Sequence, residues 1–122
     1  MKSTCHCGGV ELLIKIPNGL KELRRCNCSI CRKKGTVVAS VAIENLTVVK
    51  VEKILTEYTF YTHTAKHYFC SRCSIYTHHK RRSNPNQYGV NIACIEGINI
   101  EDFLHIGYVE GRGFFGDEGW RL

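Results

Sequence analysis

The chain has 122 residues, a length that suits one compact domain with a modest core. Its longest apolar stretch, around residues 37–43, is far too short to cross a bilayer, which excludes a membrane-spanning helix. The formal charge of +6, from 17 Lys and Arg against 11 Asp and Glu, favours an anionic partner, either nucleic acid or a small acidic substrate.

The apolar segments predict a chain built mainly of β-strands. The first strand is expected over residues 10–16, because β-forming residues there run into the turn Pro17-Asn18-Gly19. Further strands are expected over residues 36–43, 46–51, 58–61, 66–69, 76–79 and 88–95. Helical periodicity is weak, so only two short helices are expected, over residues 32–34 and 101–104. Cys94 is expected to pack in a strand core.

The cysteines carry the strongest functional signal in the sequence. Seven of the eight fall into three tight clusters: Cys5 and Cys7; Cys26, Cys28 and Cys31; Cys70 and Cys73. The N-terminal residues lack the apolar segment of a signal peptide, so we expect a cytoplasmic protein whose cysteines stay reduced. Zinc takes four ligands at a structural site and three plus an open position at a catalytic one. Seven clustered thiols therefore suggest one closed site and one open site.

Spacing alone leaves two divisions of these ligands open. In the first, a ribbon-type site combines Cys28 and Cys31 with Cys70 and Cys73. In the second, Cys5 and Cys7 join Cys70 and Cys73, and the remaining trio forms a separate site. The second division has a physical advantage, because the trio lies within six residues and one loop can deliver it to one ion.

The other charged and titratable residues have less specific interpretations. Basic residues gather in three clusters, at residues 21–25, at Arg32, Lys33 and Lys34, and at residues 80–82. They would bind an anion, balance the charge of metal-bound thiolates, or form a solvated surface. The four histidines on or near predicted strands are interpreted as surface or packing residues: His63, His67, His78 and His79.

Three motifs in order resemble the glutathione-dependent formaldehyde-activating enzyme family, which shares its domain with the centromere protein V group. They are the runs at residues 5–10 (Cys-His-Cys-Gly-Gly-Val), 26–35 (beginning Cys-Asn-Cys-Ser-Ile-Cys) and 68–73 (Tyr-Phe-Cys-Ser-Arg-Cys). The tail matches more loosely, through residues 105–109 and Trp120. The resemblance implies one zinc-binding domain over residues 1–122, with a mainly β, Mss4-like fold. Proteins of this family usually have glycine directly after the second cysteine of the last pair, where this chain has Ser74.

The resemblance also implies the ligands and the chemistry. It places Cys5, Cys7, Cys70 and Cys73 on a structural zinc, and Cys26, Cys28 and Cys31 on a catalytic zinc. Two zinc ions per chain are thus expected. Three thiolates already give the second site a net charge of −1, which weakens the ion as a Lewis acid and disfavours binding of a further thiolate, so this ion is expected to be labile. The implied reaction is that of a carbon–sulfur lyase, an S-hydroxymethylglutathione synthase that joins the glutathione thiol to formaldehyde.

The implied substrate suggests a role for the basic residues, although the composition leaves a second function open. Glutathione carries two carboxylates, so Arg32, Lys33 and Lys34 are the first candidates to bind it, with Arg24 and Arg25 second. The alternative is a non-catalytic module whose fold is held together by zinc and which binds nucleic acid or a protein. Nucleic acid is the less favoured partner, because no aromatic residues alternate with Lys and Arg as in single-strand binders.

Overall fold

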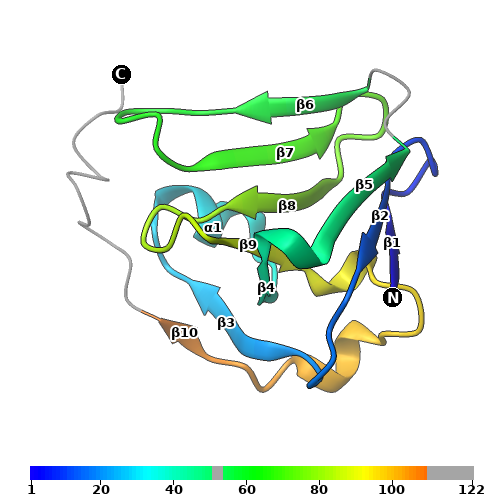
Figure 1. Cartoon of the computed structure of the whole chain (residues 1–122). Coiled ribbons are helices and arrows are strands. Elements are labelled where there is room, and N and C mark those ends of the chain that lie inside the picture. The colour runs from blue at the N-terminus through cyan, green and yellow to red at the C-terminus, as the bar shows by residue number, and fades with distance from the viewer. Residues whose placement is uncertain (51–53, 110–122) are drawn as a thin grey trace.

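The computed structural model describes residues 1–50 and 54–109, and strands dominate it (Figure 1). The predicted mainly β fold is confirmed. Within the described residues, every helix is too short or too polar to span a membrane. The predictions that involve Val51 and Trp120 lie outside the described residues.

The strands and helices follow one another in short steps along the chain. The strands are β1 (Lys2–Thr4), β2 (Glu11–Ile14), β3 (Lys21–Cys26), β4 (Val38–Ala42), β5 (Leu46–Lys50), β6 (Leu55–Tyr58), β7 (Lys66–Cys70), β8 (Tyr76–Lys80), β9 (Gln87–Asn91) and β10 (Tyr108–Val109). The helices are α1 (Ser29–Lys34) and three 3₁₀ turns, η1 (Ile43–Asn45), η2 (Ile92–Cys94) and η3 (Ile100–Phe103).

The described strands form two sheets. The smaller has three strands in the order β1-β2-β5, and the larger has seven in the order β10-β3-β4-β9-β8-β7-β6. All pairings are antiparallel except that of β10 with β3, which is parallel. The loop between β1 and β2 carries the first cysteine pair. In the last pair, Cys70 ends β7 and Cys73 lies in the turn to β8.

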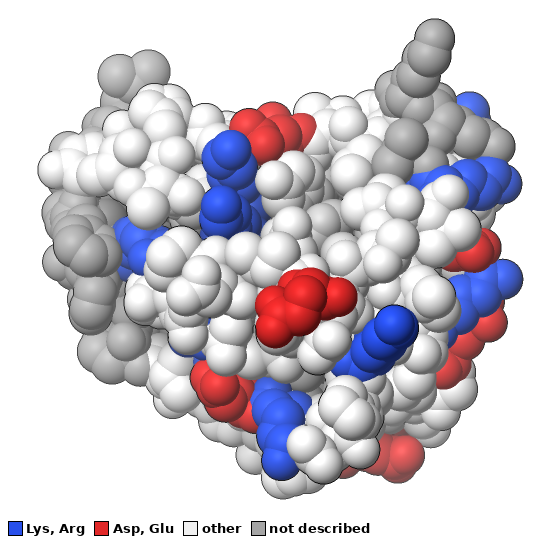
Figure 2. Space-filling view, in the orientation of Figure 1, with Lys and Arg blue, Asp and Glu red and all other residues white. Residues whose placement is uncertain are grey.

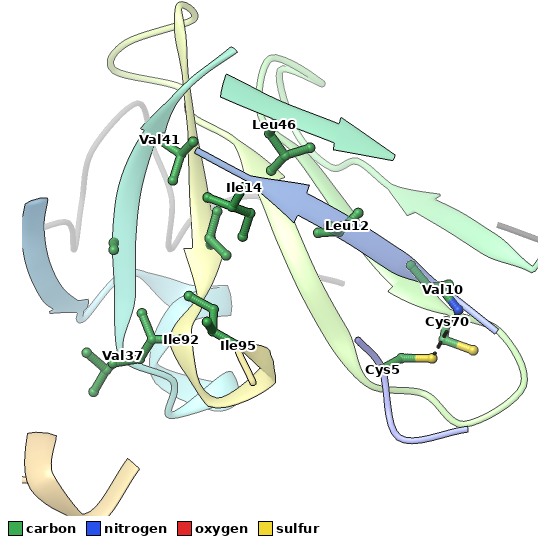
Figure 3. Close-up of a cluster of buried hydrophobic side chains, with 12 residues drawn as sticks. Cys5, Val10, Leu12, Ile14, Val37, Val41, Leu46, Cys70, Ile92 and Ile95 are labelled. Carbon is green, nitrogen blue, oxygen red and sulfur yellow. Dashed lines mark hydrogen bonds between the residues drawn. The ribbon is translucent and has the colours of Figure 1, made fainter. Parts of the chain in front are cut away.

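The core lies between the two sheets. In β2 the side chains alternate, so Leu12 and Ile14 are buried while Leu13 between them is 45% exposed. Figure 3 shows Leu12 and Ile14 facing the side chains of β4 and η2, with Cys5 and Cys70 at one end of the cluster. The central strand β4 is buried along most of its length, as its small and β-branched residues allow. The cysteine pairs therefore extend the hydrophobic core.

Several strands differ in extent from their predictions. The strand expected over 58–61 is β6, which begins and ends earlier, because Tyr61 and His63 have positive φ angles of 53° and 57° in the turn to β7. The strand expected over 88–95 ends at Asn91, whose side chain accepts a hydrogen bond from the backbone N–H of Ala93 and starts η2. Cys94 consequently lies at the end of this 3₁₀ turn, half-buried, and its predicted place in a strand core is wrong.

The expected helices are found with longer or shifted bounds, and three strands were not predicted. The segment 32–34 is the second half of α1, and 101–104 overlaps η3. The unpredicted strands are β1, β3 and β10, which are short or rich in charged residues. Pairing with neighbouring strands, rather than their own composition, makes them extended.

Candidate metal centres and the adjoining cavity

The first and last cysteine pairs converge at one point. The sulfur atoms of Cys5, Cys7, Cys70 and Cys73 all lie within 4.8 Å of one another. Cys5 and Cys70 are buried, Cys73 is half-buried and Cys7 is exposed. Two turns separated by more than sixty residues thus meet at the end of the core (Figure 3).

Both turns present backbone N–H groups to sulfur. Val10 donates to Cys5 Sγ at 3.3 Å, and Cys73 donates to Cys70 Sγ at 3.4 Å. In each turn the residue after the second cysteine has a positive φ, +80° at Gly8 and +70° at Ser74. Burial opposes ionisation of Cys73, but N–H donors of Cys7 and Ile75 outweigh it and lower its pKa to about 6. In the last pair the Cys73 thiolate is thus stabilised, whereas burial raises the pKa of Cys70 to about 11.

The four sulfurs fit a tetrahedral zinc ion. Ligands at the usual Zn–S distance of about 2.3 Å lie about 3.8 Å apart. The Cys5–Cys7 and Cys7–Cys70 sulfur distances are 3.6 Å and 3.7 Å. A disulfide would need about 2.05 Å, and all eight cysteines are free thiols. The donor set and its spacing therefore fit a four-coordinate metal ion.

The middle cysteines form a second, separate group. The sulfurs of Cys26, Cys28 and Cys31 also lie within 4.8 Å of one another. Cys26 ends β3, Cys28 is the N-cap of α1, and Cys31 lies in that helix. The backbone N–H of Cys28 donates to Cys26 Sγ at 3.4 Å. One strand-to-helix turn thus delivers three thiols to one point, and the ribbon-type grouping of Cys28 and Cys31 with the last pair does not form.

The three thiols influence one another's ionisation. Hydrogen bonds from Cys28 and Cys31 lower the pKa of Cys26, whereas the same hydrogen bond to Cys26 raises the pKa of Cys31. Cys26 is therefore the first of these thiols to lose its proton, and its hydrogen bond with Cys31 keeps Cys31 protonated. A metal ligand must be a thiolate, so this group also fits a cation such as zinc.

The three-sulfur group opens onto a cavity of about 220 Å³. Its walls include the three cysteines, the basic residues Arg24, Arg81 and Arg82, the histidines His67 and His79, and the apolar residues Ile30, Val38 and Phe60. Among the described residues that line it, none is acidic. The cavity therefore combines a thiol-rich wall with positive charge, an arrangement that suits a small anionic ligand.

Two arginines are anchored together at the cavity wall. Arg24 Nη1 donates to the Ser40 hydroxyl at 2.9 Å, and Arg81 Nη1 donates to the same oxygen at 3.1 Å. Arg81 also bonds a carboxylate oxygen of Glu22 at 3.1 Å. Burial and the nearby Arg81 lower the pKa of Arg24. One exposed carboxylate thus faces two guanidinium groups, which leaves a net positive charge beside the cavity.

The basic residues named from the sequence lie in different places. Arg24 lines the cavity, whereas Arg32, Lys33 and Lys34 are not among its lining residues. Lys33 is exposed on α1, and the Lys34 ammonium turns toward His67. Arg25 lies over the ring of Tyr108, at 5.9 Å.

Sequence reasoning missed the two histidines and Arg81 as cavity residues. His67 and His79 are buried, at 4% and 8% exposure, and face each other across β7 and β8. His78 points to the other side of β8, where it stacks on Tyr68 with ring centroids 4.6 Å apart. A signal was present, because His67 and His79 share one face if β7 and β8 pair in this register.

Comparison with known proteins gives a family match over most of the chain. Residues 1–105 match the family described as glutathione-dependent formaldehyde-activating enzyme. The chain belongs to this family. The resemblance to this family, which the cysteine motifs indicated, is thus confirmed. Its mainly β, Mss4-like fold is confirmed as well. Membership supports, in general terms, activation of formaldehyde that depends on glutathione.

A solved structure agrees with this family assignment. The crystal structure of a Rhodobacter sphaeroides protein, a structural genomics target, is 50% identical in sequence and superposes with a TM-score of 0.85. The match covers 89% of this chain and 100% of that chain. The fold described above is therefore similar to one seen by experiment.

Proposed function

We propose that the protein is a zinc-dependent enzyme of the carbon–sulfur lyase type, which joins the glutathione thiol to formaldehyde to give S-hydroxymethylglutathione. The observation that carries the proposal is the three-sulfur group of Cys26, Cys28 and Cys31 on the wall of a basic cavity. Three ligands beside an open space are the arrangement of catalytic zinc sites.

The two sulfur groups have different roles in this proposal. Cys5, Cys7, Cys70 and Cys73 hold a structural zinc, because four sulfurs complete its coordination. Cys26, Cys28 and Cys31 hold a second zinc and leave one position open. When bound there, zinc lowers the pKa of a thiol so that it is a nucleophile at neutral pH.

The chain's own side chains bind and orient the substrate. Arg24 and Arg81 lie where a carboxylate of glutathione can accept hydrogen bonds from guanidinium N–H groups, which often bind carboxylates in pairs. Their shared contact with Ser40 fixes both in place before substrate arrives. Ile30, Val38 and Phe60 keep much of the wall apolar, which limits water around the reacting thiol.

On one face of the molecule, the charge distribution of the described residues shows no surface suited to nucleic acid. On the face in Figure 2, Lys and Arg lie scattered among acidic and uncharged side chains and form no continuous basic stripe. Proteins that bind nucleic acid gather such residues along one face or one element. The three arginines at the cavity, by contrast, point to a small ligand.

The test is adduct formation by a Cys28→Ser variant. The uncatalysed addition is itself measurable, so the rate is obtained by NMR exchange between ¹³C-formaldehyde and its glutathione adduct, with and without protein. Wild type should accelerate the exchange, and Cys28→Ser should lose at least about 100-fold, because even outer-shell partners of metal ligands are worth about 10–100-fold. The Cys94→Ser control lies outside both sulfur groups and should keep the wild-type rate. Full adduct formation by Cys28→Ser would contradict the proposal.

A further inference from the structure

A polar pair, one member of which lines the cavity, has no part in the function described so far. Lys34, the last residue of α1, places its Nζ 2.8 Å from Nδ1 of His67 in β7. The same ammonium lies 3.6 Å from the centroid of the Tyr76 ring. His67 lines the cavity that the three-sulfur group also lines.

Stability alone does not account for this pair. Burial disfavours the charged form of Lys34 and lowers its pKa to about 8, although the nearby Cys31 and Cys28 thiols partly oppose this by favouring the ammonium. A lysine placed there for stability would be expected to pair with a carboxylate, yet within residues 1–50 and 54–109 Lys34 forms no salt bridge with one. Its partner is an imidazole, whose own pKa burial lowers to about 3. The pair thus holds a cationic donor against a neutral ring.

This contact fixes which ring nitrogen of His67 carries the proton. An ammonium group can only donate, so Nδ1 accepts and the proton of the neutral imidazole sits on Nε2. Phe60 and His79 stack against the ring, with centroid distances of 5.9 Å and 5.3 Å, and hold its plane. No other atom of the described chain hydrogen-bonds to Nε2. Within the described residues, the N–H of Nε2 is therefore the polar group that His67 can offer to a ligand in the cavity.

We propose that His67 is the catalytic proton donor to the aldehyde oxygen and that Lys34 positions the His67 ring and supplies it with a proton. The proposal rests on the function proposed above. The thiolate sulfur supplies the electron pair of the new C–S bond, and the pair of the C=O π bond moves to oxygen. That oxygen takes the proton from Nε2 of His67, while Lys34 passes one proton to Nδ1. The proton released earlier by the thiol returns through water to Nε2 of His67, and the proton on Nδ1 goes back to the Lys34 amine. Both residues are thus restored, and in net terms the thiol proton ends on the product hydroxyl.

The tautomer is tested first, without reference to activity. Ring ¹⁵N NMR of the zinc-loaded protein should find His67 neutral at pH 7, with its proton on Nε2 and Nδ1 accepting. In Lys34→Met this preference should be lost, and in Lys34→Arg, which keeps a donor, it should return. A proton on Nδ1 of His67 in the wild type would overturn the proposal.

Kinetics then separate proton transfer from packing. His67→Gln keeps a side-chain donor of similar size but cannot pass on a proton, so kcat for adduct formation should fall about 10²–10⁴-fold, the usual contribution of general acid catalysis. KM for glutathione should change less than about threefold, since the group acts in the transition state. Lys34→Met should lose at least about tenfold in kcat, and Lys34→Arg should recover part of it through the restored tautomer.

The controls are His105→Gln and Lys15→Met, both at exposed positions away from the cavity. Both should keep the wild-type rate, and every variant should keep the wild-type zinc content. If His67→Gln retains kcat within about threefold of an active wild type, the proton-donor role is wrong and the proposed function stands. If the wild type itself does not accelerate adduct formation, the proposed function fails instead.

Discussion

Ser74 holds the turn after the last cysteine pair in the left-handed region, with φ at +70°. Its backbone N–H donates to the carbonyl of Cys70 at 2.7 Å, and Ile75 accepts a hydrogen bond from the N–H of Cys70 at 3.0 Å. Gly8 occupies the same place after the first pair, at φ +80°. Ser74 therefore adopts the left-handed conformation that glycine would take more easily, and its backbone is strained as a result.

Replacing Ser74 with glycine should stabilise the zinc-loaded protein. A left-handed L-residue costs about 1–2 kcal/mol, and glycine gives back about 0.5–1 kcal/mol in unfolded-state entropy, which leaves a gain of about 0.5–1 kcal/mol. The free energy of unfolding, from urea denaturation, measures it. Ser71→Gly, at an exposed residue of the same turn without a positive φ, should be less stable than wild type. A Ser74→Gly variant that gains nothing would show that the turn is unstrained.

Strands β8 and β9 pack closely at the cavity because a glycine faces a histidine. Gly89 lies opposite His79 in the register, and a Cβ on Gly89 would lie 2.3 Å from Cε1 of the His79 ring. That ring is held by the Tyr76 hydroxyl at Nδ1 and by stacking on His67. The ring thus has little freedom to move aside.

Gly89→Ala should therefore destabilise both the pairing and the cavity. Overpacking at a buried site costs about 1–3 kcal/mol, which should appear as a lower midpoint of urea denaturation. Displacement of His79 should also disturb the His67 ring and slow adduct formation. Gly107→Ala is the matched control, because nothing lies within 4 Å of the Cβ it would add, and it should stay within about 0.5 kcal/mol of wild type. Equal stability of the two variants would mean that His79 is not confined.

The sequence predicts some strands well and others poorly. Alternating apolar residues mark β2, and clusters of β-branched or aromatic residues mark β5, β7 and β8. By contrast, β3 contains Lys21, Glu22, Arg24 and Arg25, so its composition indicates a basic surface, and pairing with β4 and β10 makes it a strand. Local pattern cannot supply a pairing partner that comes later in the chain.

The same distinction applies to the site. Cys26, Cys28 and Cys31 are close in sequence, so their convergence could be predicted from spacing. Arg81 is 59 residues from Glu22 and meets it only because β8, β9, β4 and β3 are consecutive strands of one sheet. His67 reaches Lys34 in the same way, from a strand to a helix 33 residues away. Contacts of this kind depend on strand order, which no motif specifies.

Across the whole molecule, the four-sulfur group connects the two sheets. Cys5 and Cys7 belong to the loop between β1 and β2 of the smaller sheet, and Cys70 and Cys73 belong to the end of β7 in the larger one. A shared ion would hold the sheets together where the core of this 122-residue chain ends. Binding of structural zinc in small domains contributes on the order of 10–16 kcal/mol, comparable to the whole stability of a domain. The three-sulfur group, in contrast, draws on one local segment, so its loss should leave the sheets in place.

In the proposed function, the seven clustered thiols divide into a closed structural site and an open catalytic one. Native mass spectrometry of the wild type and of Cys26→Ser, with circular dichroism on the same samples, tests it most directly. We predict about two zinc ions per chain in the wild type and about one in the variant, with the β-sheet spectrum unchanged. Loss of both ions together with the folded spectrum, or no change in zinc content, would contradict the division.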